Sequence, residues 1–183
     1  MRLFEKMTKI LRENDLAKSY AEYVIDDYKS LEVKLNKWRE VSLTLSKTRR
    51  KNQVNERKEL VEHLFRILDY FESSYTTYIY DLYDLCHYLK NNPSINPTKK
   101  ASNKILLAIN TKQQLRKEFE TIYTTFKNMA KKLDDIPMKE ILKRMREVFD
   151  FNSTKTNEEL KYVEEKYQPI RYYDSTTMTI RTT

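Results

Sequence analysis

Apolar side chains recur at alternating spacings of three and four residues over three long segments of this chain. A pattern of this kind, sustained over four or more heptads, is typical of long helices that pack side by side, because it keeps the apolar residues on one face. Only three polar positions interrupt it, at Asn14, Ser42 and Lys112. The first heptad stripe consists of Leu3, Met7, Ile10, Asn14, Ala17, Ala21, Val24, Tyr28, Leu31, Leu35, Trp38, Ser42 and Leu45; the second consists of Val61, Leu64, Leu68, Phe71, Tyr75, Tyr78, Leu82, Leu85 and Leu89; the third consists of Ile105, Ala108, Lys112, Leu115, Phe119, Ile122, Phe126, Met129 and Leu133.

The 183 residues include no glycine and only four prolines. Glycine adopts positive φ without penalty and lets the backbone approach a ligand closely, so phosphate-binding loops, dinucleotide fingerprints and nucleophile elbows depend on it. The sequence therefore excludes these sites in their standard forms. The scarcity of helix-breaking residues also favours long helices.

The boundaries predict an all-α fold in which residues 1–150 form an elongated antiparallel helical bundle. Pro93 and Pro97 interrupt the pattern and predict a loop, and Pro137 predicts the start of a shorter helix. Short connections favour antiparallel neighbours. We expect three long coiled-coil-like helices over about 2–47, 54–91 and 97–135, and a short helix over 137–150.

Residues 151–183 are predicted to form a second short helix and an extended C-terminal tail. Thr156 and Glu159 have the spacing of a capping box, and β-branched and aromatic residues are frequent after Pro169. An isolated strand is not stable, so the tail is expected to contact its own bundle, a second copy or another protein. The expected contact residues are Ile170, Tyr172, Tyr173, Met178 and Ile180.

The formal net charge is +8, and cations gather where an antiparallel bundle would bring the first turn and the end of the third helix together. Such a cluster suits a phosphate backbone, an anionic lipid or an acidic protein, although cations also stabilise and solubilise helix ends. No base-reading motif is present, so any nucleic-acid binding would be non-specific and sensitive to salt. The predicted cluster consists of Lys47, Arg49, Arg50, Lys51, Arg57, Lys58, Lys127, Lys131 and Lys132.

Charge also differs between the second and third helical segments. Residues 59–92 carry two basic and six acidic residues, for a net charge of −4, whereas residues 98–134 carry nine basic and three acidic residues, for a net charge of +6. Opposite charge favours correct pairing between surfaces. We therefore expect the second and third helices to lie side by side.

Candidate catalytic and metal-binding groups are few. Cys86 is the single cysteine, so no internal disulfide forms, and the two histidines have no zinc-site spacing. Asp81, Asp84 and His87 are spaced along one helical segment, but the paired motif of a di-iron bundle is missing. The sequence predicts no catalytic residue, metal site, cofactor or small-molecule substrate, and hence a protein that is not an enzyme.

The N-terminal segment is amphipathic. Its apolar residues stand against the cations Arg2, Lys6, Lys9 and Arg12, a pattern that also occurs in helices lying on membrane surfaces. Packing in the bundle core is the expected alternative. The apolar residues are Leu3, Phe4, Met7, Ile10 and Leu11.

Taken together, these patterns predict a structural or scaffold protein that contacts other protein chains, of its own or another kind, through its helix faces and tail. The alternatives are non-specific nucleic-acid binding by the basic cluster and binding to an anionic membrane surface. A cytoplasmic or intracellular location is expected, a virion component being one possibility. The absence of glycine and the 14 tyrosines are compatible with an AT-rich genome, such as that of a phage, a virus or a low-GC bacterium.

Overall fold

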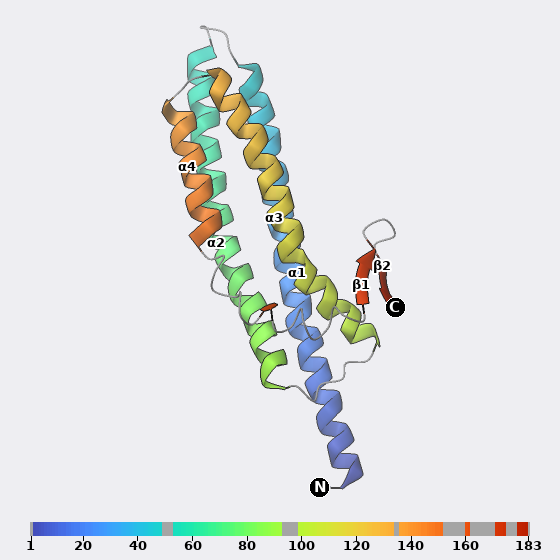
Figure 1. The fold of residues 1–183 in the computed structure, drawn as a ribbon. Coiled ribbons are helices and arrows are strands. Elements are labelled where there is room, and N and C mark those ends of the chain that lie inside the picture. Colours follow the sequence, from blue (N-terminus) through green and yellow to red (C-terminus); the bar gives the residue numbers. More distant parts are fainter. Residues whose placement is uncertain are drawn as a thin grey trace.

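A computed structural model of the chain shows an elongated, predominantly helical molecule (Figure 1). It describes residues 2–48, 53–92, 99–133, 136–151, 160–161, 171–174 and 179–182. The helices are α1 (Leu3–Lys47), α2 (Val54–Asn91), α3 (Lys99–Leu133) and α4 (Ile136–Phe151), and the strands are β1 (Arg171–Asp174) and β2 (Thr179–Thr182).

The predicted helical architecture is confirmed, and the boundaries of its four described long and short helices lie within two residues of those expected. Of the predicted second short helix, only residues 160–161 are described, and both are helical; the rest of that segment lies outside the described residues. Pro137 stands in the first turn of α4, where its missing N–H costs no helical hydrogen bond.

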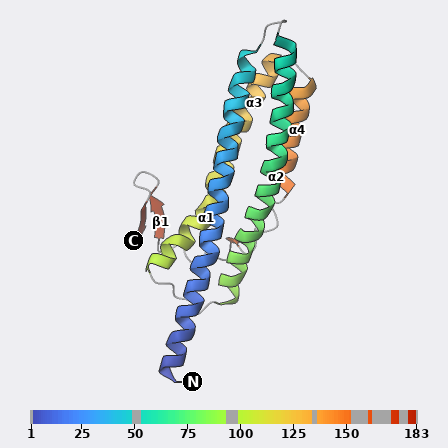
Figure 2. The ribbon, with the colours of Figure 1, turned by 180° about the vertical axis from the view of Figure 1, so that it is seen from behind.

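Helix α1 is the common neighbour of α2 and α3 (Figures 1 and 2). Both helices pack closely against α1, whereas their own backbones do not pack closely against each other. Helix α4 lies alongside both and covers the space between them at one end of the bundle. The two helices nevertheless touch directly through the hydroxyls of Tyr78 in α2 and Thr111 in α3, which lie 2.8 Å apart.

Two arginines of α4 form ion pairs with its two neighbours. Arg144 hydrogen-bonds Glu72 of α2. The guanidinium of Arg146 donates to both carboxylate oxygens of Glu120 of α3, at 2.8 and 3.1 Å, and lies over the ring of Tyr123, 4.3 Å from its centre. Arginine suits such bidentate and stacked contacts. The acidic α2 and the basic α3 are thus each connected to α4.

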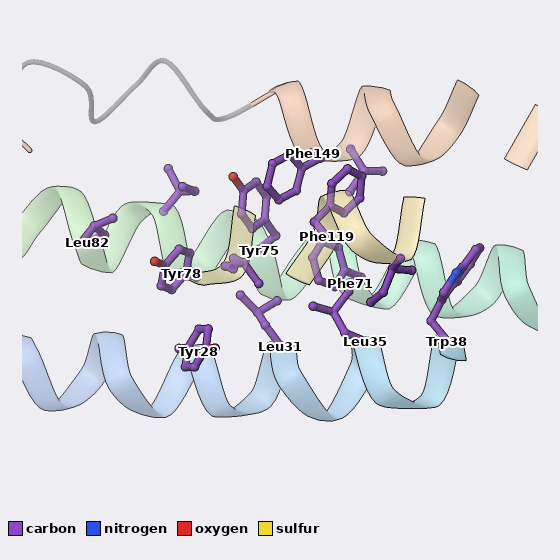
Figure 3. Close-up of a cluster of buried hydrophobic side chains, with 14 of the residues drawn as sticks. Tyr28, Leu31, Leu35, Trp38, Phe71, Tyr75, Tyr78, Leu82, Phe119 and Phe149 are labelled. Carbon is purple, nitrogen blue, oxygen red and sulfur yellow. The ribbon is translucent and has the colours of Figure 1, made fainter. Parts of the chain in front are cut away.

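The heptad stripes meet in one continuous core (Figure 3). Phe149 of α4 stacks on Phe119 of α3 and on Tyr75 of α2, with ring centres 3.9 and 5.5 Å apart. Tyr78 is fully buried, and its hydroxyl lies 2.8 Å from that of Thr111, which itself donates to the carbonyl oxygen of Ala108. The polar atom that this tyrosine brings into the core is therefore satisfied.

The first three residues of the first heptad stripe are not part of this core. Leu3, Met7 and Ile10 are exposed, whereas the stripe is buried from Asn14 onward through α1, apart from half-buried Ser42. The N-terminal end of α1 extends past the neighbouring ends of α2 and α3 (Figure 1). The prediction that the N-terminal apolar residues pack in the core is wrong, because no described helix reaches their level.

The C-terminal tail contains two strands that pair with each other. β1 and β2 are antiparallel, with Arg171 opposite Thr182 and Asp174 opposite Thr179, and β1 lies beside α3. The tail was expected to be extended and to contact its own bundle, a second copy or another protein; two of its segments are strands, and each supplies the backbone partners that one strand alone lacks. Of the expected contact residues, Tyr172, Tyr173 and Ile180 lie in the strands, and Ile170 and Met178 lie outside the described residues.

The burial of the first heptad stripe predicts how substitutions along α1 affect stability. Leu31 is fully buried, so Leu31→Ala should lower the free energy of unfolding by about 2–5 kcal/mol through lost burial and the resulting cavity. Leu43 lies on the same helix but is mostly exposed, and Leu43→Ala should change it by no more than about 0.5 kcal/mol. Urea unfolding followed by circular dichroism measures both. Equal losses would contradict the assignment of α1's buried face.

Candidate functional site

The largest group of exposed apolar side chains on α1 lies at its N-terminal end. We call residues 3–12 the N-terminal extension; at the helical rise they span about 15 Å. Leu3 and Phe4 are 76% and 80% exposed. Contiguous apolar surface of this kind marks interaction sites more often than chance. The exposed apolar residues of the extension are Leu3, Phe4, Met7, Ile10 and Leu11.

Local hydrogen bonds and a polar face support the extension as a helix. The carboxylate of Glu5 accepts the backbone N–H of Arg2 at 3.0 Å, which satisfies one of the unpaired donors at the helix start. Thr8 donates to the carbonyl oxygen of Phe4, and Lys9 lies 3.9 Å from Glu13. The extension therefore has an apolar and a polar face.

The direction of the apolar face follows from the heptad spacing. Leu3, Met7 and Ile10 continue, at the same three- and four-residue steps, the stripe that Ala17 and Ala21 bury in the bundle. Residues on one heptad stripe share a face of the helix. The exposed residues thus point into the space beyond the ends of α2 and α3, and the surface has the pattern of a helix–helix contact.

The predicted basic cluster is assembled in part within the described residues. The end of α1, the start of α2 and the end of α3 meet at the opposite end of the bundle from the extension (Figure 1). Arg57 is half-buried, and the other described members are exposed. Arg49, Arg50 and Lys51 lie outside the described residues. The structure brings to this end Lys47, Arg57, Lys58, Lys127, Lys131 and Lys132.

A groove of about 590 Å³ runs between α1 and α3 close to the basic end. Trp38 and Phe126 contribute apolar surface, and Arg39 and Lys132 are its charged residues. Two buried polar atoms of lining residues, Trp38 Nε1 and Ser42 Oγ, have no hydrogen-bond partner within the described residues. Sequence reasoning missed this groove. The one indication of the groove in the sequence was Ser42, a small polar residue at a stripe position where apolar residues are the rule.

A second groove, of about 450 Å³, lies between α1 and α2. It carries three cations, Lys34, Lys37 and Arg66, together with His63 and the exposed ring of Tyr70. Lys37 is bonded to Glu40 at 3.4 Å, and Lys34 donates to Ser30. These local bonds show that part of the groove's charge is already neutralised by α1 itself.

A pair of carboxyl groups faces across the contact between α1 and α2. Burial, followed by the hydrogen bond and charge of Asp81 and the charge of Asp26, raises the pKa of Asp27 to about 7. Two close carboxylates cannot both ionise without cost, so Asp27 keeps its proton to a higher pH than a free aspartate. Sequence reasoning missed this pair, because its recognition requires the register of one helix against the other.

The remaining chemical candidates do not come together. Asp84 and His87 are exposed, and the His87 ring stacks on Tyr83 and lies 2.9 Å from the Asn91 amide. Cys86 is buried. Within the described part of the chain, no group of three His, Cys, Asp or Glu side chains has metal-site geometry. No described helix combines the length and apolar character needed to cross a membrane.

The chain was compared with protein-family models, with curated proteins and with solved structures, and no match was found in any of the three. A function for this chain is therefore inferred from its own surfaces. Of these, the N-terminal extension carries an exposed heptad stripe, the pattern by which helices pack against one another.

The raised pKa of Asp27 predicts that stability falls as the pH rises. The folded chain keeps this proton to about pH 7, whereas an unfolded aspartate loses it near pH 4. The folded state thus binds more protons between these values, and its stability decreases across that window.

Asp27→Asn removes this titration. The variant should therefore be more stable than the wild type at pH 8, and the advantage should shrink towards pH 5. Asp15→Asn, on the exposed surface of the same helix, is the matched control and should keep the wild-type pH profile. Urea unfolding at a series of pH values measures this, and parallel profiles for all three proteins would disprove the assignment.

Proposed function

We propose that this chain is a non-enzymatic structural or scaffold protein that joins a larger protein assembly, and that the N-terminal extension is its principal contact. The observation that carries the proposal is the continuity of the first heptad stripe. One stretch of it packs in the bundle, and the next, with the same spacing, is uncovered. Because an uncovered stripe of this kind is completed by another helix, a helical partner supplies what the chain itself does not.

The free energy gained by burying the extension is enough for a contact that other contacts in an assembly reinforce. Burying one large apolar side chain contributes about 1.5–3 kcal/mol, so covering the five partly exposed residues contributes about 5–10 kcal/mol. Association costs about 4–15 kcal/mol in lost translational and rotational freedom. The extension alone therefore gives a weak complex, and additional contacts in the same assembly make it stable.

The C-terminal strand pair is the second proposed contact. Within the described residues the sheet consists of β1 and β2 alone, so each strand has one edge without a described strand beside it. Such edges accept an added strand from another protein. A tail contact of this kind would support the extension from a different part of the surface.

Non-specific nucleic-acid binding is the second candidate function, and the observation that favours it is the gathering of six described cations at one end of the bundle. It depends on phosphate contacts alone and so must weaken steeply as salt increases. DNA and RNA shift assays at about 50 and 200 mM salt test it, with Lys131→Glu and Lys132→Glu as the variants. Binding that neither salt nor the variants reduce would remove this candidate.

A membrane-surface role is the third candidate, supported by the amphipathic character of the extension. The arrangement of the helices argues against a membrane-surface role. Helices α2 and α3 pack on the same face of α1 that carries the exposed stripe, so they obstruct a flat bilayer laid along that face. Flotation with anionic liposomes tests this role.

Affinity purification from the native source, with the full chain as bait, tests the leading proposal. Leu3→Gln, Met7→Gln and Ile10→Gln together should remove most of the captured protein, because they make the exposed stripe polar without touching the core. Tyr23→Gln, Val33→Gln and Leu43→Gln form the matched control, since these residues are equally exposed on α1 but lie outside the stripe. Mass spectrometry quantifies capture. Equal capture by both variants would refute the proposal.

A further inference from the structure

We propose that the groove between α1 and α3, close to the basic end, binds one free amphiphile that has a single apolar chain and an anionic head group. The groove is a different surface from the N-terminal extension, so this inference goes beyond the proposed function and does not depend on it. Three observations carry it: an apolar floor, a hydroxyl group without a partner, and two cations with no carboxylate among the described residues around them.

The floor of the groove is apolar and elongated. Trp38 and Phe126 are buried, with ring centres 5.4 Å apart, and Ile122, one helical turn before Phe126, is buried as well. The lining residues run from 38 to 46 on α1 and from 121 to 132 on α3, which is about 12–16 Å at the helical rise. The volume of about 590 Å³ lies within the range of small-molecule sites, about 300–1,000 Å³. A ligand that fills the groove is therefore elongated and largely apolar.

One hydroxyl group in the groove has no hydrogen-bond partner. Of the four described hydroxyl side chains that line it, Ser46, Thr121 and Thr125 each donate to a carbonyl oxygen three or four residues earlier in the same helix, at 2.6–3.0 Å. Such local bonds are common for serine and threonine in helices. Ser42 Oγ is buried and pairs with nothing within the described residues. Because a serine hydroxyl turns about a single bond, it can donate to an oxygen atom of a ligand.

The charge of the groove is positive. Arg39 on α1 and Lys132 on α3 line it from opposite walls, and no described lining residue is acidic. Arg39 donates to a neutral group, the side-chain oxygen of Asn36, at 3.2 Å. In the second groove, by contrast, Lys37 is paired with Glu40. Cations of this kind beside an apolar surface favour a ligand whose head group is an anion.

The two parts of an anionic amphiphile thus match the two kinds of surface in the groove. Burial of the apolar chain over Trp38 and Phe126 provides most of the affinity, since exposed charge pairs contribute little. Ser42, Arg39 and Lys132 select the head group, because hydrogen bonds to an anion are stronger than those between neutral groups. Helix α4 packs on α2 and α3 and contributes no described residue to the lining, so it leaves the groove open.

Titration of the full chain with dodecanoate, below the concentration at which it forms micelles, tests the site. Trp38 is the single tryptophan of the chain, so its emission reports on the groove directly. We expect a saturable change in this emission and, by calorimetry, one dodecanoate bound per chain. Absence of saturable binding by both methods would overturn the site.

Two further probes separate the contributions of the chain and the head group. Acetate, which lacks the apolar chain, should not bind. Dodecyltrimethylammonium, which has the same chain and a cationic head group, should bind about tenfold more weakly than dodecanoate. Equal binding of the two amphiphiles would overturn the assignment of an anionic head group.

Removal of charge from the groove should weaken binding without unfolding the chain. Arg39 and Lys132 are exposed, so Arg39→Gln and Lys132→Gln leave the core intact. Each should weaken dodecanoate binding about threefold, and the two together about tenfold. Lys37→Gln, on α1 but in the second groove, is the matched control and should bind as the wild type does. A double variant that binds as tightly as Lys37→Gln would show that these cations do not hold the head group, and the proposal would be wrong.

Ser42→Ala separates binding from stability. Its hydroxyl pairs with nothing within the described residues, so its removal should not lower the midpoint of urea unfolding. The same variant should bind dodecanoate about tenfold more weakly, because it loses a hydrogen bond to a charged group. A lower unfolding midpoint with unchanged dodecanoate affinity would assign the hydroxyl to the fold and contradict its role in the site.

The N-terminal extension offers dodecanoate another apolar surface, and one variant distinguishes the two. Leu3→Gln, Met7→Gln and Ile10→Gln together should leave dodecanoate binding unchanged, because these residues lie outside the groove. Loss of binding in this variant, with none in the double variant of Arg39 and Lys132, would place the amphiphile on the extension and overturn the groove as its site. Since the two proposals depend on different residues, failure of this inference leaves the proposed function standing.

Discussion

The packing of α2 and α3 on one face of α1 is the interaction on which the remainder of the molecule depends. Both helices bury the same heptad stripe, and their own backbones stay apart. The space between them is then filled by α4, whose Phe149 enters the aromatic core and whose arginines pair with each neighbour. Because α1 extends beyond the ends of α2 and α3, neither helix covers the N-terminal part of its heptad stripe.

Much of the architecture was predictable from the sequence, because the signals involved are local. Apolar spacing specified the long helices, and Pro137 specified the start of α4 within one residue. The spacing could not say which residues would be covered, since burial depends on where the neighbouring helices end. Leu3 and Leu31 occupy equivalent stripe positions, yet one is mostly exposed and the other fully buried.

The features that sequence reasoning missed all depend on contacts between distant segments. The carboxyl pair of Asp27 and Asp81 exists only because α1 and α2 meet in one particular register. The net charges of α2 and α3 favoured their pairing, but charge summed over a helix does not give the direction of each side chain. The ion pairs of Arg144 and Arg146 on the short α4 could therefore not be predicted from it. The tail was expected to contact its own bundle, a second copy or another protein; β1 lies beside α3 and pairs with β2, a pairing that the sequence pattern did not indicate.

The first heptad stripe runs without a break from the bundle into the N-terminal extension, and both the fold and the proposed assembly depend on it. The quantity to measure is therefore how far the extension is covered by a partner. Hydrogen exchange of the full chain, measured by mass spectrometry for the purified chain and for the chain captured in its assembly from the native source, reports that coverage residue range by residue range. The account predicts that the amides of residues 3–12 exchange more slowly in the assembly than in the purified chain, while those of residues 17–45 are protected in both. Exchange of residues 3–12 that is equally fast in both samples would contradict it.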